Sequence, residues 1–348
     1  MPFTVQELEN IANQTLDFHL KGQAKSQTLQ NKPLLRELRK PSNRKTFPGG
    51  KEFITRRVKG DYTTTIQGYQ GDDSVTYANP ANVKQAYVPW KEIHAGISVT
   101  LSELKANGIS IVDSANGSGE RMHSDREMVA LSNLFQDKLE DMTEGFDRGM
   151  NLMLWRDGTQ DSKEVPGIRS FIVNSPSSAA IVGGLDQSAL SWWRNRASLN
   201  INAGTPANQN LVNTLQAEFR QLRRYGNPRH VFLCGSDFLT AFEKELKALG
   251  NYTMTGWAQS GRIDASVADL AFKGVNLEYD PTLDDEGLAK YGFVIDMGAV
   301  NLMPMDGEDM KKHTPARPEN KYVLYRAVTW TGGLAYDQRN TSGVYSIA

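Results

Sequence analysis

The chain has 348 residues, with 39 basic and 40 acidic side chains and a single cysteine, Cys234. A chain of this length can bury a sizeable core and form two domains, and its near-zero net charge excludes a global field that would draw it to nucleic acid or to a membrane surface. The cysteine count excludes a disulfide framework and suits a reducing cytoplasm. No run of about 18 apolar residues predicts a membrane-spanning helix, and the N-terminus lacks the basic and apolar blocks of a signal peptide.

Residues 1–48 are predicted to form an arm rather than a domain. Thr4 and Glu7 make a capping box that opens a short helix, and polar and basic stretches follow it as far as Pro48. A segment of this composition buries too little apolar surface to order itself. We therefore expect a neighbouring subunit to hold the arm in place.

The next segment, residues 49–100, is predicted to be an extended hairpin with little core of its own. Strand-forming residues are concentrated at 62–69, the return leg lies near 83–89, and a turn-rich tip falls at 71–73. A strictly alternating apolar pattern at 93–101 predicts a further strand. A two-stranded ribbon is marginal alone, and its unpaired edges invite pairing with another chain.

One long helix, predicted over residues 125–156, has the strongest pattern in the chain. Its apolar residues recur at spacings of 3 and 4 along one stripe, from Met128 to Met153. Ser124 and Glu127 form a capping box at its start, and Gly158 is suited to follow its end. At ~1.5 Å per residue the helix is about 50 Å long, which is typical of a structural spine rather than of a compact domain. A short helix is expected before it, at 102–106.

The remainder of the chain alternates strands, helices and long turns, which predicts an α+β domain from about residue 165 to 316. Helices are expected at 211–222 and 239–249, and strands at 231–234, 275–279, 293–296 and 301–303. The last segment, 322–348, is rich in aromatic and β-branched residues. It is predicted to form closing strands with an interruption at Gly332 and Gly333.

Two patterns suggest chemistry, and a structural interpretation is favoured for both. Cys234 lies where a strand meets a helix, with His230 nearby, so it is either a thiol nucleophile or a buried, inert cysteine followed by Ser236 as a helix cap. We favour the inert cysteine and expect no catalytic residue. The carboxylates around Asp284, at 280–286, lack calcium-loop spacing. We favour a solvated acidic turn over a cation site at a subunit contact, and expect no metal and no cofactor.

Two further motifs concern phosphate and base recognition. The glycine-rich residues 116–121 lack the lysine of a P-loop, so a flexible entry to the long helix is favoured over a phosphate cradle. Trp192 and Trp193, beside Arg194 and Arg196, are candidates for stacking on bases. Adjacent side chains point in different directions, so we expect at least one of the two tryptophans to be packed in the core.

The order of these parts resembles the major capsid proteins of tailed bacteriophages, a fold that encapsulin shells share. Residues 183–186 (Gly-Gly-Leu-Asp), 191–195 (Ser-Trp-Trp-Arg-Asn) and 165–168 (Val-Pro-Gly-Ile) are similar to stretches in a subset of phage capsid sequences. The resemblance implies an α+β fold, the tailed-phage major capsid protein fold, with the following parts: an N-terminal arm (1–48), an extended hairpin or E-loop (49–100), a peripheral P domain (101–164) that includes the spine helix (125–156), an inserted axial A domain (165–318), and terminal strands that return to the P domain (319–348).

The resemblance also implies a function. The protein would be non-enzymatic and would self-assemble into hexamers and pentamers of an icosahedral head that encloses double-stranded DNA. It would be assembled in the host cytoplasm and located in the virion, with portal, scaffolding and decoration or cement proteins as partners, no sequence-specific DNA binding and no membrane. An encapsulin-like nanocompartment shell is the alternative, and a thiol enzyme using Cys234 and His230 is a weaker one.

The chain departs from parts of this family in two ways. Some relatives carry a long cleaved scaffold segment at the N-terminus, whereas this chain has only a short arm. Some crosslink through a lysine and an asparagine, and the sequence identifies no such pair.

Charged and aromatic residues of the hairpin and the long helix are the candidates for contacts between subunits: Arg56, Arg57, Lys59, Tyr62, Tyr69, Glu140 and Glu144. The hairpin cations would meet either packaged DNA or the acidic residues of a neighbour's helix. We favour the helix, because in the resembled family a hairpin lies over a neighbour's spine. Charge reversal at Arg57 is then expected to weaken assembly.

Overall fold

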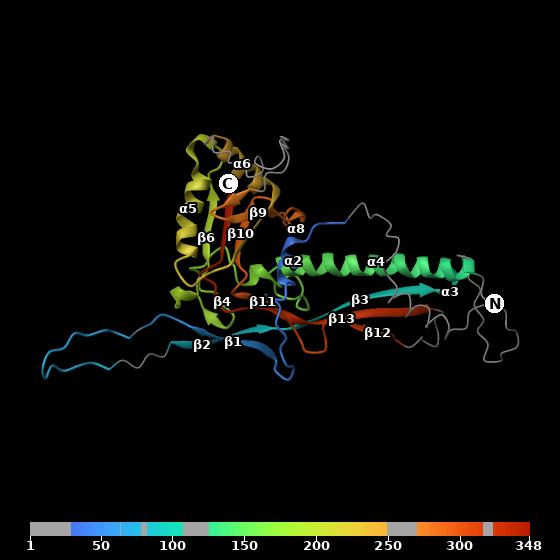
Figure 1. The fold of residues 1–348 in the computed structure, drawn as a ribbon, viewed down its shortest axis with the longest axis horizontal. Helices are drawn as coiled ribbons and strands as arrows, with labels where there is room; N and C mark the ends of the chain where they lie inside the picture. The colour runs from blue at the N-terminus through green and yellow to red at the C-terminus, as the bar shows by residue number, and fades with distance from the viewer. Residues whose placement is uncertain (1–28, 63, 78–81, 107–124, 249–269, 316–322) are drawn as a thin grey trace, which may run out of the picture. The chain divides into compact units, whose positions relative to one another are not determined.

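The computed structural model describes residues 29–62, 64–77, 82–106, 125–248, 270–315 and 323–348 (Figure 1). Several expectations lie outside these residues, namely the helix after Thr4, the loop at 116–121, the cap at Ser124 and the last residue of the helix predicted at 239–249. The chain divides into two compact units. The first unit comprises Met1–Gln30, Glu92–Met150 and Gly307–Thr331, and the second comprises Asn31–Lys91, Asn151–Asp306 and Gly332–Ala348.

A six-stranded sheet lies at the centre of the second unit. Its strands, in spatial order, are β6 (Arg196–Ile201), β14 (Gly343–Ile347), β10 (Tyr291–Asp296), β7 (His230–Cys234), β9 (Val275–Tyr279) and β8 (Ala271–Phe272). The sheet is mixed, because β14 with β6 and β7 with β9 pair in parallel while the other neighbours pair antiparallel. The strands predicted at 231–234, 275–279 and 293–296 are confirmed.

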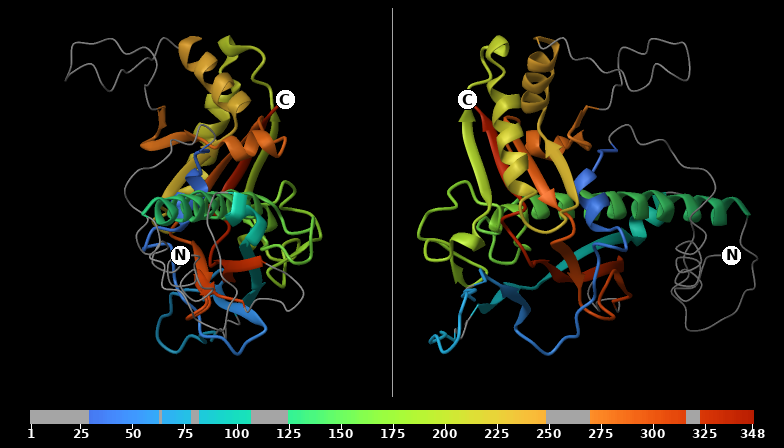
Figure 2. Two further views of the ribbon diagram at one scale, coloured as in Figure 1. Left: turned by 90° about the vertical axis from the view of Figure 1, so that its right-hand side faces the viewer. Right: turned by 60° about the vertical axis from the view of Figure 1, so that its left-hand side comes forward.

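Two amphipathic helices, α5 (Asn210–Leu222) and α6 (Ser236–Ala248), cover one face of this sheet (Figure 2). Their apolar sides join alternate strand residues, such as Phe232 and Val294, in one buried cluster. The 3.6-residue apolar period of both helices predicted this burial. Ser236 is the first residue of α6 rather than its cap, and its N–H donates to Asp284 Oδ1 at 3.0 Å.

The hairpin belongs to the second unit and consists of β1 (Phe53–Lys59) and β2 (Val83–Pro89), which pair antiparallel from Phe53 with Pro89 to Lys59 with Val83. The strand predicted at 62–69 is wrong for the part that the structure describes, because residues 62 and 64–69 belong to no strand. Strand propensity reflects packing on a half-buried surface, and Ile66 is fully exposed, so the subunit offers the segment no such surface.

A second sheet contains the long strand β13 (Val323–Tyr336). In the second unit its end pairs with β11 (Val300–Pro304), from Val300 with Tyr336 to Pro304 with Gly332. The predicted interruption at Gly332 and Gly333 is wrong, because β13 continues through both. A Cβ atom at Gly333 would lie 3.0 Å from both Ile54 Cδ1 and the carbonyl oxygen of Pro89, so glycine permits close backbone packing there.

In the first unit, β13 also pairs with β3 (Lys91–Thr100) and with β12 (Lys311–His313). The long helix, α4 (Asp125–Trp155), ends within one residue of its prediction, and α3 (Leu101–Ala106) confirms the short helix expected at 102–106. Within α4 the predicted stripe is buried at Phe135, Leu139 and Phe146. Lys138, on another side of the helix, forms a 2.7 Å ion pair with Glu103 of α3.

The remaining elements of the second unit are short: α2 (Pro33–Leu38), η1 (Ile168–Ser170), β4 (Ile181–Val182), β5 (Leu185–Asp186), η2 (Ser191–Trp193), η3 (Pro206–Asn208) and α8 (Pro281–Asp285). Asn151, in the last turns of α4, links two of them. Its side chain accepts a 3.1 Å hydrogen bond from the N–H of Leu35 and donates at 2.7 Å to Thr282 Oγ1. Among the described residues, no helix combines the length and the apolar character needed to span a membrane.

Candidate assembly surface

The base of the hairpin is fastened to the second unit by apolar packing and one ion pair. Ile54 joins a small buried cluster with Phe47, Met303 and Ala335. On the partly exposed side of β1, Arg56 Nε lies 3.2 Å from a carboxylate oxygen of Asp337. Arg56, a candidate for contact with a neighbour, is therefore paired within its own subunit.

Two close approaches between glycine and aromatic residues seat both legs of the hairpin on residues 183–193. A Cβ atom at Gly60 would lie 2.6 Å from the Trp192 indole, and one at Gly184 would lie 1.9 Å from the Tyr87 ring. The N–H of Tyr87 also donates a 3.1 Å hydrogen bond to the carbonyl of Gly183. Glycine is needed at both positions, because any side chain would displace the ring beside it.

Trp193 is almost completely buried, and its Nε1–H donates to the carbonyl of Val182 at 2.9 Å. The half-buried Trp192 lies against Gly60, at the end of the β1 leg. Packing, the interpretation favoured from sequence, is confirmed for Trp193. Trp192 also has a structural role, as a support for the exit of the hairpin.

Arg339 holds residues 171–195 together through hydrogen bonds, and no sequence pattern pointed to it. Its buried guanidinium donates to the carbonyls of Phe171 (2.7 Å) and Trp193 (2.8 Å) and to side-chain oxygens of Gln187 and Asn195, both at 3.1 Å. Burial lowers the pKa of Arg339 to about 10. No sequence signal marks this arginine, because its acceptors lie more than a hundred residues away along the chain.

Beyond Lys59 the hairpin continues as an extended connection (Figure 1), and its large side chains are exposed. Tyr62 is 80% exposed, Tyr69 71% and Tyr77 92%. Lys59 Nζ lies 4.3 Å from the centroid of the Tyr62 ring, a local cation–π contact. Large apolar side chains exposed in this number on one segment favour a surface that binds a partner.

Arg57 is exposed on β1, in the second unit, whereas Glu140 and Glu144 are partly exposed on α4, in the first. The two glutamates belong to an acidic stripe of α4 whose members are Asp137, Glu140, Asp141, Glu144 and Asp147. At 100° per residue this stripe lies opposite the buried stripe of the same helix. The cationic and acidic candidates are therefore carried by separate units of the subunit.

The residues considered for chemistry have structural roles. Burial raises the pKa of the Cys234 thiol to about 12 and lowers the pKa of His230. His230 Nε2 lies 2.9 Å from the carbonyl of Thr341. Four residues of extended strand separate the two side chains by roughly 13 Å, so histidine cannot activate the thiol.

The acidic residues after β9 are partly structural as well. Asp280 is fully buried, accepts a 2.8 Å hydrogen bond from Trp155 Nε1 and caps α8 through the N–H of Thr282. Loss of solvation raises its pKa. The expectation of a solvated turn was wrong for Asp280, because a tertiary contact with Trp155 removes it from water. Across the described residues, no three histidine, cysteine, aspartate or glutamate side chains are grouped to hold a metal ion.

Solved structures of phage capsids match this architecture over almost the whole chain. The cyanophage A-1(L) capsid asymmetric unit has a TM-score of 0.66 at 13% identity, covering 94% of this chain and 95% of that one. The chain has the fold of phage capsid proteins. The capsid of the native GTA particle (TM-score 0.56, 14% identity, 95% and 96% coverage) and the capsid of Myoviridae phage XM1 (0.52, 9%, 95% and 96%) share this capsid fold. No family model matches the sequence, and neither does any curated protein at a significant level.

Proposed function

We propose that this capsid-fold protein is the major capsid protein of a tailed phage, a structural protein that self-assembles into hexamers and pentamers of an icosahedral head around double-stranded DNA. The observation that carries the proposal is the hairpin, whose connection exposes Tyr62, Ile66, Tyr69 and Tyr77 in a subunit that otherwise has the capsid fold. Arms and ribbons without a core gain stability only by burying area on partners. The near-neutral charge suits a shell that encloses DNA without binding it tightly.

In this proposal the chain is organised as an N-terminal arm (1–48), an E-loop (49–100), a P domain (101–164) with its spine helix, an A domain (165–318) and terminal strands (319–348). Portal, scaffolding and decoration or cement proteins are the expected partners, with assembly in the host cytoplasm and final location in the virion.

Electron microscopy in negative stain tests the proposal directly, on the full chain expressed alone and with the products of its neighbouring genes. Closed shells or hexameric rings are expected. Enclosed DNA would support a phage head, and enclosed protein cargo would instead indicate an encapsulin-like compartment. A monodisperse monomer under both conditions would overturn the capsid function.

The contact between the hairpin and a neighbour's α4 is tested by charge reversal. Arg57→Glu is expected to raise the protein concentration needed for assembly severalfold, because it places a carboxylate against the acidic stripe that contains Glu140. Adding Glu140→Lys should restore much of the loss. Lys244→Glu, an exposed reversal on α6, is the matched control for net charge. Normal assembly of the Arg57 variant would contradict this contact.

A further inference from the structure

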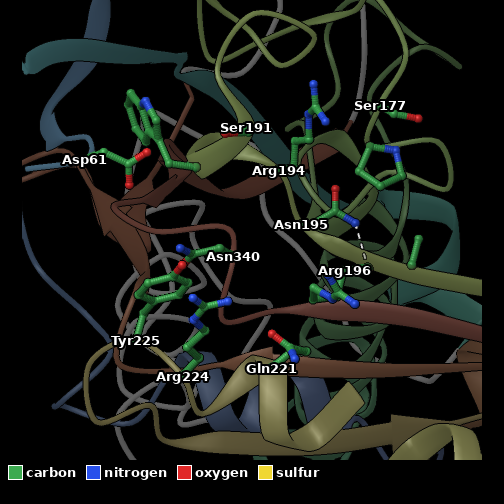
Figure 3. A pocket seen from close by; sticks show the side chains of 13 residues that line it. Asp61, Ser177, Ser191, Arg194, Asn195, Arg196, Gln221, Arg224, Tyr225 and Asn340 are labelled. Atoms are coloured by element: carbon green, nitrogen blue, oxygen red, sulfur yellow. Dashed lines mark hydrogen bonds between the residues drawn. The ribbon is translucent and has the colours of Figure 1, made fainter. Parts of the chain in front are cut away.

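A cleft of about 450 Å³ lies in the second unit, beside the base of the hairpin. We call it the arginine cleft, because Arg194, Arg196 and Arg224 are part of its lining. In Figure 3, Arg224, Tyr225 and Asn340 lie on one side of the cleft, and Arg194 and Arg196 lie on the other. Clefts of this volume are typical of sites that bind small molecules.

Arg194 is held in place by neutral partners and keeps its charge. Its Nε and Nη2 donate to the carbonyls of Gln187 and Ser188 at 2.7 and 2.6 Å, so two hydrogen bonds fix the plane of the guanidinium. The carboxylate of Asp186 interacts with this charge, but it is held in its own turn by the N–H and the hydroxyl of Ser188. Among the described residues, Nη1 of Arg194 has no partner and is free to donate to a ligand.

Arg224, on the facing wall, is a second cation without a carboxylate partner among the described residues. Its guanidinium lies 5.3 Å from the centroid of the Tyr225 ring, which is 45% exposed. Arg196 adds no free charge, because it forms a bidentate pair with Glu218 at 2.8 and 2.7 Å. Hydrogen bonds from an arginine to an anion are about twice as strong as those between neutral groups, and the planar guanidinium matches a phosphate well.

Neutral donors surround Arg224. The amide oxygen of Asn340 accepts a 2.6 Å hydrogen bond from Gln338, which leaves the amide nitrogen of Asn340 for a ligand. Gln221 also lines the cleft. Asp61 is the one carboxylate among the described lining residues, and Figure 3 shows it apart from Arg224. This wall therefore offers several N–H donors to the oxygens of one anion, which a tetrahedral phosphate supplies.

We propose that the arginine cleft binds a small nucleotide, with its phosphate against Arg224 and Asn340 and with acceptor atoms of its base towards Arg194. A phosphate ion alone would leave most of the cleft empty, whereas a nucleoside monophosphate reaches from one wall to the other. Purine bases that carry O6 and N7 present two acceptors on one edge, and these suit an arginine donor. A nucleic-acid strand fits less well, because Asp61 repels a polyanion and the near-neutral chain supplies no wider field to hold one.

Calorimetric titration of the full chain with inosine 5′-monophosphate tests the site, since this nucleotide carries O6 and N7. We expect saturable binding with a dissociation constant of about 1 mM or below. Inosine and inorganic phosphate should each bind at least about tenfold more weakly, because each contacts only one wall. The nucleotide should also raise the unfolding temperature, since it binds the folded chain alone. No saturable binding, or equal affinity for phosphate alone, would overturn the inference.

Substitutions at Arg224 locate the binding in this cleft. Arg224→Gln should weaken nucleotide binding by about tenfold, because it removes the charge opposite the phosphate. Arg224→Lys keeps the charge without the planar fork and should bind with intermediate affinity. Arg220→Gln is the matched control, since Arg220 is exposed on α5 outside the lining, and it should bind as the wild type does. Wild-type affinity of Arg224→Gln would overturn the inference.

Nucleic acid shares the phosphate and base chemistry, so a short single strand and its duplex are titrated separately. A small-ligand site predicts that neither displaces the nucleotide and that its affinity depends little on salt. Displacement by either one, with a steep dependence on salt, would identify nucleic acid as the occupant and overturn the inference. The capsid function is tested apart from this site. Failure to bind the nucleotide leaves shell assembly unaffected, and failure to form shells leaves nucleotide binding measurable.

Discussion

Two regions of the second unit carry large apolar side chains in opposite environments. One is the group of helices and strands around Phe219, and the other is the connection between β1 and β2. Phe219, Phe232 and Phe242 are completely buried in the cluster between α5, α6 and the six-stranded sheet. Ile66 and Tyr77 on the hairpin are almost fully exposed. The sheet region is therefore stabilised within one subunit, whereas the apolar area of the hairpin contributes only after a partner covers it.

The largest effect is expected from a substitution in the sheet region, which is stable without a partner. Phe219→Ala should lower the free energy of unfolding by about 3–5 kcal/mol, because it removes a fully buried ring from a packed cluster. Denaturant unfolding of the unassembled subunit measures this loss. Phe219→Leu keeps most of the volume and should cost less than about 1.5 kcal/mol. A loss below that value in the alanine variant would contradict the burial of the ring.

A smaller effect, dependent on pH, concerns the buried carboxylate of Asp280. Loss of solvation raises its pKa in the fold above the value in the unfolded chain, so its contribution to stability is present below the unfolded pKa and is lost as pH rises through the folded pKa. Asp280→Asn retains a capping oxygen without the charge. The variant should therefore gain stability relative to the wild type as pH rises from acid to neutral, measured by urea unfolding at several pH values.

Asp72→Asn is the matched control, because Asp72 is exposed on the hairpin tip rather than buried in the sheet unit. Its free energy of unfolding should stay within about 0.5 kcal/mol of the wild-type value. A stability difference for Asp280→Asn that does not change with pH would contradict the role assigned to burial.

The smallest effect on subunit stability is expected from a substitution in the hairpin connection. Ile66→Ser should change the free energy of unfolding by less than about 0.5 kcal/mol, because the side chain makes no covered contact in the subunit. The same variant should assemble poorly, since that apolar area then cannot be buried on a neighbour. Unfolding and light-scattering assays on one preparation separate the two effects. A large loss of subunit stability would show that Ile66 packs within its own chain.

Local periodic patterns located the long helix and several of the strands. The spacing of apolar residues placed α4 within one residue of its observed end, and the alternation before Leu101 located β3. The predicted strand at 62–69 failed although its residues favour extended structure, because strand formation there needs a surface that the subunit lacks. The continuous course of β13 through Gly333 was missed because the nearby Ile54 is distant in sequence.

The candidate surface was predictable in part. The hairpin cations and tyrosines were identified from composition and stay predictions as contact residues. Arg56 also forms an ion pair with Asp337 of its own subunit, a contact that no sequence spacing predicts. The cleft lined by Asp61, Arg194, Arg224 and Asn340 was not foreseeable, since these residues come from four separate segments.

The sequence by itself determined the spine helix, the positions of most strands and helices, the core-poor hairpin and the resemblance to phage capsid proteins, because these depend on periodicity and on the order of parts along the chain. Only the tertiary structure decided that Asp280 is buried under Trp155, that Arg339 organises residues 171–195, and that separate arginines share one cleft. The physical reason is that burial and charge compensation are set by residues far apart in sequence, whose proximity exists only in the folded chain.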